Sequence, residues 1–184
     1  MADNRTLFAR RVTLARATSA LALATGLAIA GSGSAHAQSA GAFEGTPTVV
    51  SGGVVINRTT NTDTIRVDTN QAVINWTTND MAIGGGVINF LPNGRTAFFR
   101  NNPTAQNQFT VLNRIIPNDP SRAISFNGTI ISQLQTGAGL VPGGNVWFYS
   151  PGGIVVGATS VIDVGGLLLT SADPVRDGAG NFIN

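Results

Sequence analysis

Residues 144–169 pack several short apolar strands between glycine turns, which leaves no room for a helix. The apolar runs 146–149, 154–156 and 167–169 are too short and too close for a conventional sandwich, where turn signals come about every 8–12 residues. Strands with this spacing suit a solenoid, in which each short strand is covered by its neighbours in adjacent coils. This segment therefore predicts a stacked β architecture.

The preceding segment has a related pattern. After a start predicted to be flexible, 38–45, apolar patches recur between residues that favour turns through positive or fixed φ. The patches are 54–56, 65–67, 72–76, 87–91, 97–99 and 111–116. Some patches alternate with polar residues and others are continuous, which indicates strands with one wet face and strands covered on both. A right-handed parallel β-helix with covering loops or a hairpin offers this mixture, and about 20 residues per coil would give residues 38–184 about seven coils.

Residues 1–37 read as an export signal. Four arginines lead into a 14-residue apolar run, 17–30, which is shorter than the ~20 residues of a membrane-spanning helix. Ala35 and Ala37 supply a small-residue cleavage site, so cleavage is expected after Ala37. A retained anchor is the less favoured alternative, and the Arg10-Arg11 pair leaves twin-arginine export open beside the favoured general secretory route.

Charge and residue usage exclude several classes of function. Residues 38–184 contain seven arginines, no lysine and eight acidic residues, so no basic stripe is available for nucleic acid. They also lack histidine and cysteine, which removes the usual general base, the thiolate nucleophile and the common zinc ligands. The carboxylates are spread singly along the chain, so we predict no catalytic residue, metal or cofactor. Asp163 is the one that interrupts an apolar strand, and it is expected to face water.

Aromatic side chains offer two interpretations. They could form a sugar-stacking platform, but packing in the core is the commoner use and is preferred here. The residues concerned are Trp76, Phe90, Phe98, Phe99, Trp147, Phe148 and Tyr149.

Several motifs, in order, resemble the N-terminal secretion domain of two-partner secreted exoproteins of the filamentous haemagglutinin and haemolysin type. Ala-Val-Ile-Asn-Trp at 72–76 and Leu-Asn-Arg-Ile at 112–115 match segments of that domain, as do the segments 86–90, 120–124 and 127–130. Ser150-Pro151-Gly152-Gly153-Ile154 stands where the family has Asn-Pro-Asn-Gly-Ile, so Ser150 and Gly152 depart from its pattern.

The resemblance implies a right-handed parallel β-helix that is not an enzyme. It implies that the domain is bound unfolded in the periplasm by the periplasmic domains of an outer-membrane β-barrel transporter, and folds at the cell surface. The chain would then be the N-terminal part of a longer exoprotein, whose downstream regions could bind a host or surface glycan. Residues implicated in transporter recognition or turn formation are Asn75, Asn113, Ser150, Pro151, Gly152, Gly153 and Ile154.

Two other functions remain open from the sequence. An extracellular β-helix could bind carbohydrate without any transporter partner. It could also degrade polysaccharide, although such an enzyme with a calcium site would need gathered carboxylates.

Overall fold

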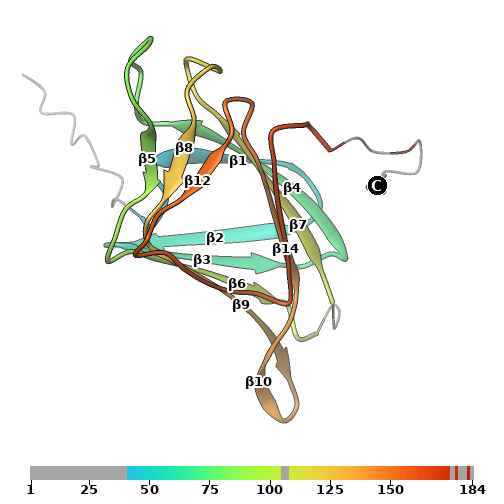
Figure 1. Cartoon of the computed structure of the whole chain (residues 1–184). Coiled ribbons are helices and arrows are strands. Elements are labelled where there is room, and N and C mark those ends of the chain that lie inside the picture. Colours follow the sequence, from blue (N-terminus) through green and yellow to red (C-terminus); the bar gives the residue numbers. More distant parts are fainter. Residues whose placement is uncertain (1–40, 105–107, 175–176, 178–181, 183–184) are drawn as a thin grey trace, which may run out of the picture. The chain divides into compact units, whose positions relative to one another are not determined.

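Short strands account for all the regular secondary structure in the residues that the computed structural model describes, which are 41–104, 108–174, 177 and 182 (Figure 1). The prediction of an all-β chain is therefore confirmed for these residues, and no helix in them could span a bilayer. The export signal and its cleavage residues, Ala35 and Ala37, lie outside the described part of the chain.

Fourteen strands in the described residues form three sheets, of which A and B are mixed and C is parallel. Sheet A has the order β1-β4-β7-β11-β14, sheet B has the order β10-β9-β6-β3-β2 with β13 also paired to β9, and sheet C has the order β12-β8-β5. The strands are β1 Gly45–Ser51, β2 Val54–Thr59, β3 Thr62–Val67, β4 Gln71–Thr78, β5 Ile88–Leu91, β6 Thr96–Asn101, β7 Thr110–Ile116, β8 Ile124–Phe126, β9 Thr129–Thr136, β10 Gly139–Pro142, β11 Asn145–Tyr149, β12 Ile154–Val156, β13 Val161–Asp163 and β14 Gly166–Thr170.

From β3 onward the chain visits sheets B, A and C repeatedly in that order. Each strand after the first round, except β10, pairs in parallel with its predecessor in the same sheet. We call one such round a circuit. Thr62, Thr96, Thr129 and Val161 are aligned across sheet B, so one circuit measured along this sheet takes 32 to 34 residues.

The expectation of about 20 residues per coil, and hence about seven coils, is wrong. Connections such as 79–87 and 117–123, together with the β9–β10 hairpin, add residues that leave the strands. Only the last passage along sheet A, from Asn145 to Gly166, is close to the expected length, at 21 residues, because the turns within it are short.

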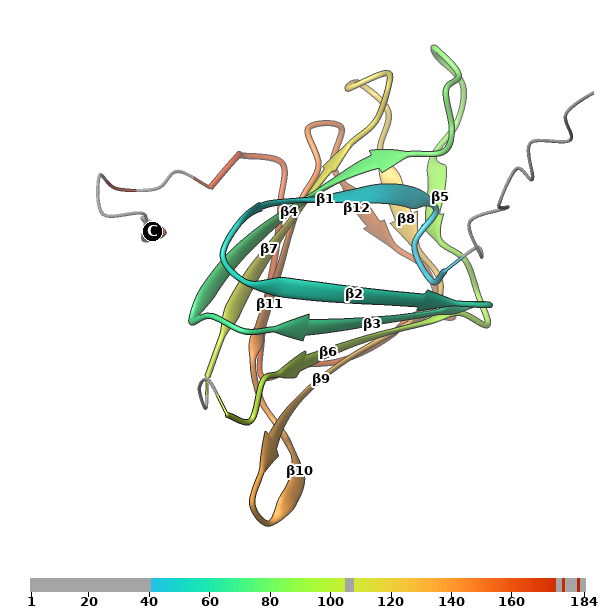
Figure 2. The same ribbon diagram turned by 180° about the vertical axis from the view of Figure 1, so that it is seen from behind.

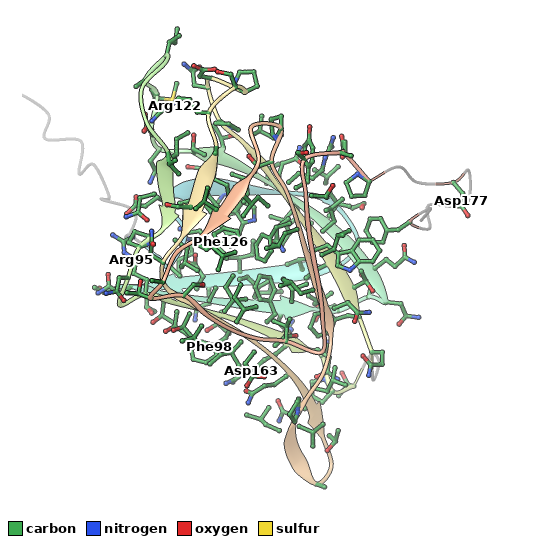
Figure 3. All side chains as sticks on the ribbon, viewed as in Figure 1. Arg95, Phe98, Arg122, Phe126, Asp163 and Asp177 are labelled. Atoms are coloured by element: carbon green, nitrogen blue, oxygen red, sulfur yellow. The ribbon has the colours of Figure 1, made fainter. Side chains whose placement is uncertain are left out.

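The core lies between the three sheets and is rich in aromatic rings. Trp76, Phe90, Phe99 and Phe148 are fully buried there, so core packing is the correct interpretation for these four. Phe126 joins them, with its ring centroid 4.8 Å from that of Phe148 (Figure 3). Three other aromatic side chains of this set point away from the core: Phe98, Trp147 and Tyr149.

Antiparallel strands cover the N-terminal edge of two sheets. β1 pairs with β4 at the edge of sheet A, and β2 pairs with β3 at the edge of sheet B. A separate hairpin of β9 and β10 projects beyond the other strands of sheet B (Figure 2). Sheet B therefore has an antiparallel edge strand on one side and a projecting hairpin on the other.

Phe43 closes the N-terminal end of the core, so the expectation that residues 38–45 are flexible is wrong for the described residues 41–45. The Phe43 ring is fully buried and lies 5.0 Å from Phe90 and 4.9 Å from Trp76, measured between centroids. Its amide donates to the buried Asp63 carboxylate at 2.9 Å, and the Arg58 guanidinium binds Asp63 and the carbonyls of Phe43 and Gly45. This local network holds a segment whose own sequence shows no strand pattern.

The C-terminal edges are different. β12 and β14 are the last strands of sheets C and A, and β13 lies beside β9 in sheet B. Their exposed apolar residues form a set that we call the C-terminal rim: Val155, Val156, Val161 and Leu167. Asp163 in β13 is exposed, as predicted from its place in an apolar strand (Figure 3).

Candidate functional site

Three connections from sheet A to sheet C lie side by side at one edge of the sheets. They are 79–87 after β4, 117–123 after β7 and 150–153 after β11, and they appear together at the top of Figure 1. Parallel, aligned strands bring successive connections to the same edge, so residues far apart in the chain meet there. We call the three connections the loop stack and treat it as the candidate site, because it contains most of the sequence-predicted residues.

Ser150, Pro151, Gly152 and Gly153 form the turn that the sequence predicted. The Gly153 amide donates to the Ser150 carbonyl at 3.0 Å, and Gly153 adopts a φ of +90°, which glycine tolerates without a steric cost. Ile154 then begins β12 beside Ile124 of β8. The Ser150 hydroxyl is buried and has no hydrogen-bond partner in the structure.

Gly152 is required here by a close approach of two backbones. A Cβ at this position would lie 2.1 Å from the Arg122 carbonyl oxygen and 2.3 Å from its carbon, where neither atom belongs to a flexible side chain. The asparagine of the family pattern would therefore not fit this geometry. The departure at Gly152 lets the last turn of the loop stack rest directly on the middle one.

Arg122 joins the middle loop to the first. Its guanidinium makes a bidentate pair with Asp80, with distances of 3.0 Å to Oδ1 and 2.9 Å to Oδ2. Nε donates to the Gly86 carbonyl at 2.9 Å and an Nη1 hydrogen to the Ala82 carbonyl at 3.1 Å. The side chain is only 8% exposed, so this fork is a nearly enclosed clamp at the loops in Figure 3.

Asp119 makes a second link between the same loops. Its carboxylate accepts from the Gly84 amide at 2.6 Å, and from the Ser121 hydroxyl at 2.6 Å. Asn118 adds a bond from its amide group to the Met81 carbonyl at 2.9 Å. The first loop is consequently fixed at several backbone positions along its length.

The electrostatics of the loop stack favour permanent charges. Hydrogen bonds from Arg122, and then from the Ala82 amide, hold the pKa of Asp80 below its usual range. The Ser121 hydroxyl and the Gly84 amide lower the pKa of Asp119 in the same way, while the Asp80 carboxylate raises the pKa of Arg122. Groups fixed in this way stay charged near neutral pH and are poorly suited to proton transfer there.

Asn75 and Asn113 lie apart from the turn, on neighbouring strands of sheet A. The Asn113 side chain faces the core, where its Oδ1 accepts from Trp76 Nε1 at 3.0 Å and its Nδ2 donates to the Trp147 carbonyl at 3.3 Å. Asn75 is aligned with Arg114, one position out of step with Asn113, and therefore faces the other side of the sheet. Neither residue forms a turn, and Asn113 is positioned to satisfy polar groups within the core.

Sequence reasoning missed Asp80, Asp119 and Arg122 as partners. The Asp80–Arg122 bond spans 42 residues, and only the register of β4 against β7 brings the two loops together. A local signal existed in the runs Asn-Asp at the start of the first loop and Asn-Asp-Pro-Ser-Arg in the second, since Asx residues organise turns.

No family model, curated protein or solved structure matches this chain. In the described residues there is also no cluster of three or more potential metal-binding side chains.

Proposed function

We propose that residues 38–184 are the secretion domain of a two-partner secreted exoprotein. In this proposal the domain crosses the periplasm unfolded, is bound by the periplasmic domains of an outer-membrane β-barrel transporter, and folds at the cell surface. The folded form is a right-handed parallel β-helix with a targeting role and no catalytic one.

The observation that carries the proposal is the arrangement of the motif segments on successive circuits. Segments 72–76 and 112–115 occupy β4 and β7, which are neighbours in sheet A. Ile88, Ile124 and Ile154, each from a different motif segment, are aligned across sheet C. A solenoid with a repeating circuit would place related motifs in this way.

Physical chemistry supports each step of the route. A chain without cysteine cannot be locked by a disulfide before it crosses the outer membrane. Unpaired segments with high β propensity can add to the edge of a receptor sheet, where main-chain bonds supply affinity. Burial of the aromatic core then favours the folded state outside and opposes return of the chain.

The C-terminal rim supports the view that the domain belongs to a longer exoprotein. Further circuits of a solenoid would cover the apolar rim residues and pair the edges of β12 and β14, which would otherwise invite other contacts. Glycan binding by such downstream regions is part of the proposal. The carbohydrate-binding alternative for this domain itself is less favoured, because Trp147 packs on Phe182 and Tyr149 lies under Arg114.

The test is secretion of residues 1–184 in cells that contain or lack the candidate transporter, scored as protein in the medium and in the periplasm. We expect the protein outside only when the transporter is present. Equal secretion in both strains, or retention of a folded domain in the periplasm with the transporter present, would contradict the proposal. A transporter without its periplasmic domains is the matched control.

A further inference from the structure

Two Asn-Gly pairs occupy equivalent turns on successive circuits. Asn93-Gly94 lies between β5 and β6, and Asn127-Gly128 lies between β8 and β9. Each pair therefore follows a strand of sheet C and precedes a strand of sheet B. Because the two pairs are chemically the same, a difference in their reactivity has to come from the fold around them.

Asparagine is among the heat-labile residues of proteins, and a following glycine makes it react most readily. The backbone nitrogen of the glycine attacks the side-chain carbonyl carbon of the asparagine, and a five-membered succinimide ring forms. The side-chain amino group leaves as ammonia with the proton of the attacking nitrogen. Water then opens the ring at either carbonyl, which gives aspartate or isoaspartate. Glycine favours the attack because it has no Cβ to restrict the backbone or shield the nitrogen.

The Asn93-Gly94 turn is open to this reaction. Both residues are exposed, and in the described part of the chain no hydrogen bond involves the Asn93 side chain or the Gly94 amide. Gly94 adopts a φ of +78°, and no atom lies within 4 Å of the place where its Cβ would be. The Asn93 side chain is therefore free to turn toward the Gly94 nitrogen, and water can reach the ring.

The equivalent turn one circuit later is closed. The Asn127 side chain is held by the previous circuit, since its Nδ2 donates to Asn89 Oδ1 at 3.0 Å. The attacking nitrogen is also engaged, because the Gly128 amide donates to the Leu91 carbonyl at 3.1 Å. A Cβ on Gly128 would lie only 2.5 Å from the Pro92 carbonyl oxygen, so the backbone here packs directly on its neighbour. Attack within this turn first requires the loss of these contacts.

We propose that Asn93 is a site of spontaneous deamidation and isomerisation in the folded protein, and that the neighbouring circuit protects Asn127. Both products carry a new carboxylate at position 93. Isoaspartate also adds one carbon atom to the main chain of the turn.

The change falls beside Arg95, which holds the segment that closes the N-terminal end of the core and is labelled in Figure 3. The Arg95 guanidinium donates to the Gly41 carbonyl at 2.9 Å and pairs with the Glu44 carboxylate at 2.5 Å. A longer main chain in the turn shifts Arg95 relative to these two partners, and the new carboxylate lies two residues from the guanidinium that it would attract. Modification of Asn93 is therefore expected to loosen residues 41–45.

Incubation of the purified chain in neutral buffer tests the site. Trypsin cleaves after arginine, so Asn93 and Asn127 fall on different peptides, 67–95 and 123–176, whose fragment masses report each site separately. In the folded protein we expect Asn93 to react at least about tenfold faster, because the closed turn must first lose hydrogen bonds. In urea the two sites should react at similar rates. Equal rates in the folded protein, or a faster reaction at Asn127, would overturn the proposal.

Asn93→Gln is the matched control, since attack on glutamine needs a six-membered ring, which forms much more slowly. A mass change in peptide 67–95 of this variant, equal to that of the unmodified sequence, would overturn the assignment to Asn93.

Hydrogen exchange of the aged protein tests the link to Arg95. The form with isoaspartate at position 93 separates by anion exchange, and its amides in 41–45 should exchange about fivefold faster, the equivalent of one lost hydrogen bond. Asn93→Gln aged in the same way should keep its original exchange rates. Equal exchange in the modified protein and in this control would overturn the link to residues 41–45.

Discussion

The two ends of the strand stack are built in opposite ways. At the N-terminal end, β1 and β2 run antiparallel to their neighbours and Phe43 fills the space between the sheets. At the C-terminal end, β12, β13 and β14 all pair in parallel and leave the rim residues Val155, Val156, Val161 and Leu167 exposed. Exposed apolar residues do not by themselves distinguish the two ends, since β1 and β2 leave Val49, Val50 and Val55 exposed. The ends differ in strand direction and in the core, because Phe43 plugs the core beside the antiparallel strands, whereas parallel pairing continues to the last strand at the other end.

Removal of the Phe43 ring should give the largest loss of stability. Phe43→Ala would leave a cavity among four aromatic rings, and we expect the free energy of unfolding to fall by about 4 kcal/mol, as for other buried phenylalanines. Urea denaturation of residues 38–184 measures it. Val156→Ala at the open end is the matched control and should cost less than about 0.5 kcal/mol, as for most surface changes. Equal losses would abolish the contrast between the two ends.

Loss of the Asp63–Arg58 ion pair at the N-terminal end should give the second largest loss of stability. Asp63 is fully buried and Arg58 nearly so, and Asp63→Asn would leave the guanidinium without its counter-charge. Loss of one partner of a buried pair usually costs 3–5 kcal/mol, and we expect about 3 because Arg58 keeps two carbonyl acceptors. The exposed Asp163→Asn at the opposite end should leave the urea midpoint unchanged. A neutral result for Asp63 would show that the carbonyl bonds alone hold Arg58.

Gly152→Ala tests the loop stack independently of the two ends of the strand stack. The new Cβ would collide with the Arg122 backbone, so we expect a loss of about 2 kcal/mol, typical of a forced backbone shift. Hydrogen exchange should rise in the first loop of the loop stack, 79–87, while the amides near Phe43 stay protected. Gly153→Ala is a useful comparison, since no atom lies near its Cβ and only the positive φ is affected. Uniform loosening of the whole domain would contradict a local role.

Acid should loosen the loop stack without a comparable direct effect on the aromatic seal. The folded-state pKa values of Asp80 and Asp119 lie below the ordinary value of about 3.9, so their contribution is complete above that pH. It is lost as the pH falls from about 4 through the lowered values, because the protonated carboxyls no longer accept the same bonds. Amide exchange of Ala82 and Gly84 between pH 6 and pH 3, compared in wild type and Asp119→Asn, measures the effect. If acid raises amide exchange equally in wild type and Asp119→Asn, the acid sensitivity does not come from Asp119.

A charge on the C-terminal rim should produce the smallest change in folding. Val156→Lys lies on an edge strand with an exposed side chain, so stability should change by less than about 0.5 kcal/mol. Lysine on an open edge does oppose pairing with other strands, and the variant should therefore aggregate less after heating, as followed by light scattering. A large loss of stability would mean that the rim is already covered in solution.

Local sequence signals succeeded where the structure is local. Short strands and the Ser150–Gly153 turn follow from residues within a few positions, since Pro and Gly restrict or extend φ directly. The length of a circuit did not follow, because the first and middle loops of the loop stack and the β9–β10 hairpin carry no stacking signal of their own. Phe43 was missed for a related reason. One ring in a glycine- and alanine-rich segment has no period, and its burial depends on four aromatic partners between 33 and 105 residues away.

The candidate site was only half predictable. Gly152 and Gly153 were expected to form a turn, but the need for glycine at 152 comes from the approach of Arg122, which no neighbouring residue encodes. Likewise, the charges of Asp80 and Arg122 are ordinary in the sequence and become a clamp only through the alignment of β4 with β7. In both cases the contact depends on the register of neighbouring strands, which the residues near Gly152 or Asp80 do not encode.

The stacking of circuits has a consequence for size. Neighbouring strands lie about 4.8 Å apart, so each additional circuit would lengthen a stack of this design by one such layer, whatever the length of its loops. Such circuits would be added at the C-terminal end, where the last strands pair in parallel, and not at the N-terminal end that Phe43 closes. A gene that adds or deletes whole circuits would thus change the reach of its product in fixed steps, and leave the width of the molecule the same.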